Sequence, residues 1–115
     1  MKSSELNRLL VKSFPNLSDV YTEEVEWQEG DNTGSHTVYG DVFTPYLVNC
    51  ITNDSKEEMS KALLYIEELL ALEDSYVDEV VAFSILESIA YLFEEKQNLM
   101  DLLGDRTKLV IKDFL

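Results

Sequence analysis

The stretch Glu73–Glu95, EDSYVDEVVAFSILESIAYLFEE, decides the fold that this chain can adopt. It is long, largely apolar and free of Gly and Pro, which predicts a helix over about 75–95. When the residues are projected at ~100° each, the apolar side chains cover a wide arc and leave only a narrow polar wedge. Because such a helix needs neighbours on several sides, we expect an all-α fold. It would be either a compact multi-helix bundle or a short α-solenoid-like stack around this central buried helix.

Two amphipathic helices are predicted near the beginning of the chain. Residues 3–13 form a first helix that ends at Phe14-Pro15, because proline disfavours the helical conformation in the residue before it. Residues 18–27 form a second helix, whose outer face is strongly acidic. The apolar residues expected on its inner face are Val20, Tyr21 and Val25.

The segment 37–52 is ambiguous, because Pro45 lies within an apolar pattern of helical spacing. Proline removes one helical hydrogen bond. The pattern therefore predicts either one kinked helix or a turn over Gly40–Phe43 followed by a helix capped by Thr44. A β-strand over 36–43 is a further alternative, which the lack of an obvious second strand disfavours.

Residues 56–70 predict a helix with an apolar stripe, and Ser55-Lys-Glu-Glu58 before it has the spacing of a capping box. The link to 75–95 is short, with Ser75 as the expected cap, so the two helices should run antiparallel. Near the end, Gly104 stops a short helix. Asp105 then caps a last helix, which carries Leu109, Val110 and Phe114.

Length and composition limit the classes of protein. The 115 residues predict one domain over 1–115, and the net charge of −14 disfavours binding to nucleic acid or to an anionic membrane surface. A basic protein partner is expected instead, and monomer is the favoured state. Cys50 is the only cysteine, and the chain has neither a signal peptide nor an apolar run long enough to cross a bilayer, so a cytoplasmic location is expected.

No catalytic signature is present. A Gly-x-Ser-x-Gly turn is missing, and a single histidine and a single cysteine cannot build a metal site of the usual Cys and His ligands. Asp31-Asn32-Thr33-Gly34 lacks the spaced acids of a calcium loop. We therefore expect a non-enzymatic protein with no catalytic residue, no metal and no cofactor.

The distribution of charge is the most informative functional feature. No Lys or Arg lies between Ser13 and Ser55 or from Ala62 to Glu95, although both intervals are rich in acids. Uncompensated acids repel one another, so their concentration suggests a surface that meets a basic partner, although acids also serve solubility. Trp27 and Tyr39 lie either at the edge of the core or in an interface, and His36 lies in a polar loop. The expected partner-binding residues are Glu23, Glu24, Glu26, Trp27, Asp31, His36, Tyr39 and Asp41.

A resemblance to a known family lies in the segment FPNLSDVYTEEVEWQEGDNTGSHTVYGDVFTPYLVNCI, in the capped helix that follows it and in EDSYVDEVVAFSILESIAYL. In these parts the chain resembles a bacterial family of small, acidic, all-helical domains of unknown function. The likeness covers roughly Phe14–Leu103 and depends on Phe14-Pro15, Trp27, His36, Gly40 and Pro45-Tyr46. Members of the family are suspected immunity proteins of polymorphic toxin systems, which bind and neutralise a cognate toxin. The resemblance implies a helical fold and a protein-binding role, but no catalytic residue.

Two functional hypotheses follow. The first is an acidic binding protein, possibly of the immunity type, that occludes a basic partner such as a toxin domain. The second is a structural or adaptor module that packs on other subunits through apolar surface, with acids present only for solubility. The first predicts a complex that weakens with salt, and the second predicts an oligomer that salt does not affect.

Overall fold

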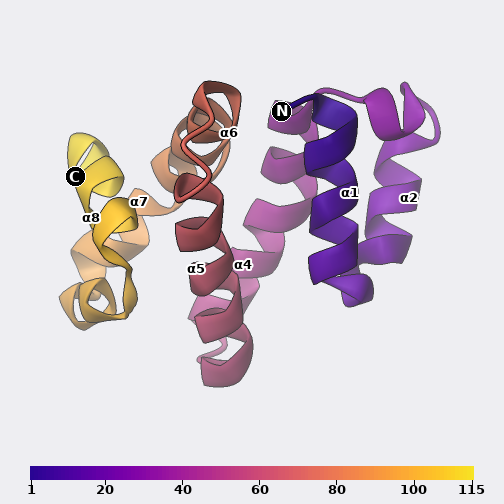
Figure 1. Ribbon diagram of the computed structural model, residues 1–115. Helices are drawn as coiled ribbons and strands as arrows, with labels where there is room; N and C mark the ends of the chain where they lie inside the picture. The colour runs from indigo at the N-terminus through magenta and orange to yellow at the C-terminus, as the bar shows by residue number, and fades with distance from the viewer.

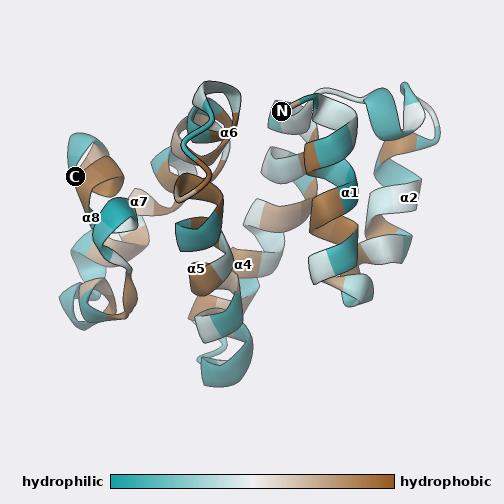
Figure 2. Cartoon of the chain, viewed as in Figure 1, coloured by the Kyte–Doolittle hydropathy of each residue, from teal (hydrophilic) through white to brown (hydrophobic).

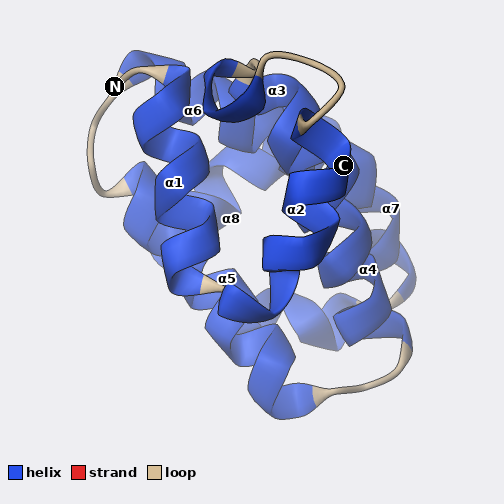
Figure 3. Cartoon of the chain, turned by 90° about the vertical axis from the view of Figure 1, so that its right-hand side faces the viewer, coloured by secondary structure: helices blue, strands red, loops and turns tan.

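The computed structural model describes the whole chain, residues 1–115, and every regular element in it is helical (Figures 1 and 3). Two segments, Tyr39–Phe43 and Val81–Leu86, are π-helical. Short 3₁₀ turns span Pro15–Leu17, Gly30–Asn32, Gln97–Leu102 and Lys112–Phe114. The all-α prediction is confirmed, and the strand considered for 36–43 is wrong. The α-helices are α1 (Ser3–Ser13), α2 (Ser18–Val25), α3 (Ser35–Val38), α4 (Thr44–Thr52), α5 (Lys56–Leu70), α6 (Ser75–Val80), α7 (Glu87–Glu95) and α8 (Asp105–Ile111).

The helices form a flattened body of 38 × 30 × 19 Å, with α1 and α2 at one end and α7 and α8 at the other (Figure 1). Apolar and polar residues alternate along each helix, which is typical of helices with one buried face (Figure 2). The body has a single core cluster of 32 buried apolar residues, to which helices from both ends contribute.

Residues 75–95 form one continuous helical rod in which α6, the second π segment Val81–Leu86 and α7 follow without a break. The rod contacts α5, α8 and the first π segment Tyr39–Phe43, so it has neighbours on several sides. Ile85 and Ile89 are fully buried, and the central buried helix is confirmed. The wide apolar arc of the predicted helix is buried apart from the half-buried Ala82; its buried members are Val81, Ile85, Leu86, Ile89, Ala90, Leu92 and Phe93.

Residues 35–52 also form one continuous helix, built from α3, the first π segment and α4. The Thr44 N–H bonds the carbonyl of Tyr39, five residues back, and Pro45, which has no N–H, follows directly. Of the two alternatives for 37–52, one continuous but irregular helix is therefore the correct one, and a separate turn over Gly40–Phe43 is wrong. Thr44 does not cap it, because its hydroxyl donates instead to the Ser84 carbonyl at 2.8 Å. His36, expected in a loop, lies in the first turn of α3.

The helix α5 buries the stripe that its sequence predicts, and the chain then turns back into α6 so that the two run in opposite directions (Figure 1). Two details of capping differ from expectation. Ser55 is at the N-cap of α5, but its side chain makes no capping bond. The cap of α6 is Asp74 rather than Ser75, with its Oδ1 accepting from the N–H groups of Tyr76 at 3.0 Å and Val77 at 3.1 Å.

The start of α8 is capped by a side chain from another helix. Glu67 of α5 accepts from the Thr107 N–H at 3.0 Å, the Thr107 hydroxyl at 2.9 Å and the Arg106 N–H at 3.2 Å. Asp105, the expected cap, is the first residue inside α8. On this helix Ile111 is buried, whereas Leu109 is 67% exposed.

Candidate partner-binding surface

The most prominent exposed group among the expected site residues lies on α2. Tyr21 and Val25 are four residues apart and both are buried, so the opposite face of the helix is turned to solvent. The tryptophan at the end of this face, Trp27, is 75% exposed, and Val20 is 49% exposed. We use the name α2 surface for the exposed residues Asp19, Val20 and Glu23 of this face together with Glu26 and Trp27 of the turn that follows α2.

The prediction that Val20 faces the core is therefore wrong, and Trp27 belongs to the surface rather than to the edge of the core. The spacing of Val20 and Glu23, three residues apart, places them on one helical face and was visible in the sequence, and Trp27 lies in the turn that follows α2. Because valine is usually buried, the sequence analysis placed Val20 on the inner face and overlooked this spacing. Glu24, also expected here, is half-buried and accepts from the Gln28 amide at 2.7 Å, so it lies beside the α2 surface rather than on it.

Two expected site residues, Tyr39 and Asp31, already have partners within the protein. Tyr39 is fully buried, and its hydroxyl donates to the Leu6 carbonyl and is hydrogen-bonded to the Tyr65 hydroxyl, each at 2.7 Å. It cannot touch a partner, so its assignment to the binding surface is wrong. Asp31 is exposed, but it accepts from the buried Tyr21 at 2.6 Å and pairs with Arg8 at 3.5 Å. Burial, together with this bond to Asp31, raises the pKa of Tyr21.

His36 and Asp41 lie on the irregular helix 35–52, and both are exposed. The His36 Nδ1 is 2.7 Å from the Ser84 hydroxyl, and the imidazole ring meets Tyr76 edge-on with centroids 5.9 Å apart. No carboxylate is hydrogen-bonded to this imidazole, so the pair lacks the group that orients the base in a serine–histidine–aspartate triad. The bond joins the two long helices.

One polar residue that the sequence analysis missed holds the loop behind the α2 surface. Asn7 of α1 is fully buried, and its amide donates to the carbonyls of Asp31 at 3.0 Å and Thr33 at 2.6 Å. Its own carbonyl oxygen accepts from the Ser35 hydroxyl at 2.8 Å. Because every polar atom of the Asn7 side chain has a partner, the segment between α2 and α3 has a fixed path. An asparagine on the edge of an apolar stripe is the signal that could have identified it.

Few of the acids are neutralised. Only three of the 23 acidic side chains form an ion pair, namely Asp31, Glu67 and Asp74. None of the acids of the α2 surface is among them. Three glutamates, at positions 23, 24 and 26, also lie at the C-terminal end of α2, where the helix dipole is negative and no basic residue is present. This placement lowers the stability of the helix.

These features define a small all-helical acidic domain. The sequence model of the domain of unknown function DUF7674 matches residues 7–115, and the chain belongs to this family. Neither the curated proteins nor the solved structures include a match to the chain. None of its helices combines the length and the apolar character that crossing a bilayer requires.

Proposed function

We propose that this domain is a non-enzymatic binding protein that recognises a basic protein partner through the α2 surface. Its biological role is that of an immunity-type protein, which neutralises a toxin domain by covering a cationic surface of that toxin. The observation that carries the proposal is an exposed tryptophan in the turn directly after a helix face whose acids form no ion pair.

The chemistry of the α2 surface suits such a partner. A large aromatic side chain that is mostly exposed in the free protein gains more buried area on binding than a small polar one, which is why tryptophan is common among the residues that dominate binding energy. The surrounding glutamates attract a cationic partner over about 8 Å at physiological salt, and this attraction raises the rate of encounter. Trp27 would thus anchor the complex, and Glu23 and Glu26 would select and orient the partner.

The cost in stability supports a functional role for the same acids. Glutamates at the C-terminal end of a helix are each unfavourable by about 0.3–1 kcal/mol, and basic residues there would be favourable. Solubility alone does not require acids at this position, because acids at helix N-termini would serve it equally well. The retention of destabilising charges beside an exposed tryptophan is what a binding surface would produce.

The direct test is binding to the product of the gene next to that of this protein, measured by titration calorimetry with purified proteins. The Trp27→Ala variant and the Glu23→Lys/Glu26→Lys variant should each bind about tenfold or more weakly. The matched control is Glu94→Lys/Glu95→Lys, which makes the same change in net charge at the C-terminal end of α7, at the opposite end of the molecule (Figure 1). Equal losses for the two charge-reversal variants, or no complex at all, would contradict the proposal.

A further inference from the structure

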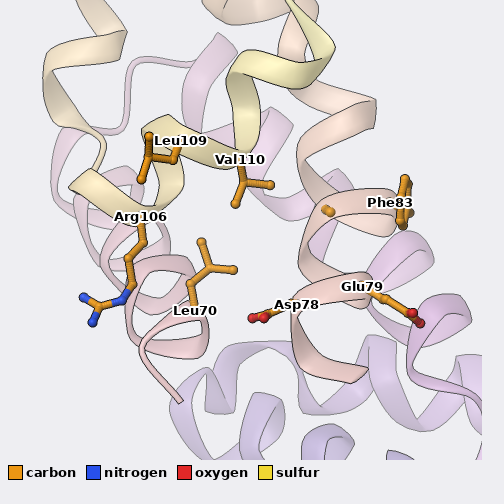
Figure 4. A pocket seen from close by; sticks show the side chains of 8 residues that line it. Leu70, Asp78, Glu79, Phe83, Arg106, Leu109 and Val110 are labelled. Carbon is orange, nitrogen blue, oxygen red and sulfur yellow. The ribbon is translucent and has the colours of Figure 1, made fainter. Parts of the chain in front are cut away.

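A groove lies at the end of the molecule away from α2, between α8 and the first half of the long helical rod (Figure 4). It has a volume of about 470 Å³. Its apolar lining comes from three elements, with Leu70 from α5, Ala82 and Phe83 from the rod, and Leu109 and Val110 from α8. The groove is thus formed by helices that the core already holds in place.

The apolar side chains at the groove are unusually exposed. Phe83 is 58% exposed and Leu109 is 67% exposed. The Phe83 ring also meets the ring of Phe114 edge-on, at a centroid distance of 6.0 Å. Isolated exposed apolar residues are ordinary, but a cluster of them around a hollow is typical of an interaction site.

The uncompensated charge at the groove is negative. Asp78 and Glu79 line it and make no ion pair. Arg106, the one base in the lining, is already 3.8 Å from the Glu67 carboxylate. Figure 4 shows the Asp78 carboxylate pointing from the rod toward Leu70, whereas the Glu79 side chain lies on the other side of the rod. An occupant therefore meets an apolar floor with a carboxylate on each side of the rod.

A second copy of this chain is a poor occupant. A two-fold interface brings identical surfaces together, so the groove acids of one copy would face those of the other. With a net charge of −14 the two copies also repel each other over their whole surfaces. The apolar lining and the free acids are instead complementary to a segment that has both apolar and cationic side chains.

We propose that this groove docks a basic amphipathic helix of a partner protein. A leucine or phenylalanine of that helix lies on Leu70 and Val110 against the Phe83 ring, and a lysine or arginine about one turn away pairs with Asp78 or Glu79. This is the helix-in-groove mode of recognition, in which apolar anchors at helical spacing supply affinity. The inference goes beyond the proposed function, because it uses a different surface and does not depend on the α2 surface.

The test uses a synthetic peptide of about 18 residues, composed of leucine and lysine with the leucines at helical spacing. The full-length protein, labelled with ¹⁵N, is titrated with the peptide and followed by NMR. Saturable shifts are expected at residues 78–83 and 106–110. A leucine–glutamate peptide with the same apolar pattern should not bind. Shifts confined to α2, shifts spread over all acidic faces, or equal binding of the leucine–glutamate peptide would overturn the proposal.

Variants distinguish binding of the peptide at the groove from nonspecific binding elsewhere on the protein. Phe83→Ala and Asp78→Asn/Glu79→Gln should each weaken peptide binding about tenfold. Tyr91→Ala is the matched control, because Tyr91 is a 51% exposed aromatic residue further along the same rod and should have no effect. Circular dichroism checks that Phe83→Ala still folds, and Leu109→Ala provides a second removal that leaves the Phe83–Phe114 contact intact. An equal loss of peptide affinity in Tyr91→Ala would overturn the proposal. So would a wild-type dimer, seen in analytical ultracentrifugation, that Phe83→Ala converts to a monomer.

The outcome is independent of the α2 surface. Glu23→Lys/Glu26→Lys should leave peptide binding at the groove within about twofold of the wild type, since these residues lie at the other end of the molecule (Figure 1). If that variant abolished peptide binding while Phe83→Ala did not, the peptide site would be the α2 surface and the groove would be excluded.

Discussion

Glu67 and Gly104 show how single residues join two helices that are far apart in the sequence, α5 and α8. The Glu67 carboxylate caps α8 from a different helix, and it can approach because Gly104 has no side chain. A Cβ atom built on Gly104 would lie 2.3 Å from the Glu67 carboxyl carbon. The carboxylate is at the end of a flexible side chain, so it would move aside, but in moving it would lose its bonds to Thr107 and Arg106.

Gly104→Ala should therefore lower the free energy of unfolding by about 1–2 kcal/mol, the usual cost of losing an N-cap. Urea denaturation measures the change. Gly40→Ala is the control, because a Cβ there makes only ordinary contacts at 3.9 Å or more and helical alanine is favoured over glycine. In a Glu67→Ala background the cost of Gly104→Ala should largely disappear. Additive costs would show that the two residues do not act through the same contact.

The same carboxylate predicts a dependence of stability on pH. Partial burial favours the protonated form, but the hydrogen bonds from Thr107 and Arg106 outweigh it and lower the pKa of Glu67. A lowered folded-state pKa adds stability above the unfolded value of about 4.3, and this stability is lost as the pH falls through the folded value. Glu67→Gln should thus be less stable than the wild type near neutral pH. The difference should shrink steadily below about pH 4 in urea titrations; a difference that is constant with pH would contradict this account.

At the scale of elements, the contact between the two π segments positions the halves of the protein. Tyr39–Phe43 and Val81–Leu86 pack against each other. Two residues of the helix 35–52 are hydrogen-bonded to Ser84: the Thr44 hydroxyl donates to the Ser84 carbonyl, and the His36 imidazole is bonded to the Ser84 hydroxyl. A π segment places one extra residue in a turn, which turns a carbonyl or a side chain away from the regular helical direction. Gly40 of the first segment faces Ser84 of the second, since a Cβ atom built on Gly40 would lie 3.9 Å from the Ser84 carbonyl oxygen.

Thr44→Val should cost about 1 kcal/mol of folding free energy, because the part-buried Ser84 carbonyl loses a donor while the volume of the side chain is unchanged. His36→Ala should cost less than about 0.5 kcal/mol, since the His36–Ser84 bond is exposed to water. Chemical denaturation of both variants gives the comparison. A larger loss for His36→Ala would show that the exposed His36–Ser84 bond, rather than the part-buried Thr44–Ser84 bond, holds the two helices together.

For α2 we predict a variant that is more stable, not less stable, than the wild type. Glu23→Lys/Glu26→Lys places positive charge at the negative end of the helix dipole and reduces the net charge of −14. The variant should be more stable than the wild type by about 0.5–1 kcal/mol, while binding its partner less well. Thermal and urea unfolding measure the first part. A variant that loses both stability and binding would indicate that these glutamates serve the fold.

How far the sequence predicts these elements depends on whether their partners are local. The buried faces of 75–95 and of α5 were predictable, because one helical period relates most of their apolar residues, although Leu64, Phe83 and Tyr91 are exposed. The π segments were not, since one extra residue in a turn leaves no mark on that period. The capping of α8 by Glu67 was also hidden, because a contact 40 residues away in sequence has no local signal. The adjacent Asp105 looked like the better cap.

The candidate site divides in the same way. The acidity of α2 and the lack of nearby bases were visible in the sequence, but the sequence could not decide which aromatic residue is exposed. Trp27 and Tyr39 were equivalent candidates, and burial separates them completely. The exposure of Leu109 could not be predicted either, because α8 is short and either face could have been placed against the rod.

At the scale of the whole molecule, the body combines one apolar core with a surface whose acids are mostly unpaired. The repulsion among these acids opposes compaction, and a cationic partner would relieve it. The α2 surface and the groove beside Phe83 lie at opposite ends, so one partner could engage one of them without covering the other (Figure 1).

The salt dependence of the association rate constant, measured by stopped flow with the product of the neighbouring gene, tests the central claim most directly. For the wild type the rate should fall steeply as ionic strength rises, because the unpaired acids steer a cationic partner to Trp27. Glu23→Lys/Glu26→Lys should flatten that dependence more than Glu94→Lys/Glu95→Lys does. A rate that is indifferent to salt, or one that both variants change equally, would contradict the account.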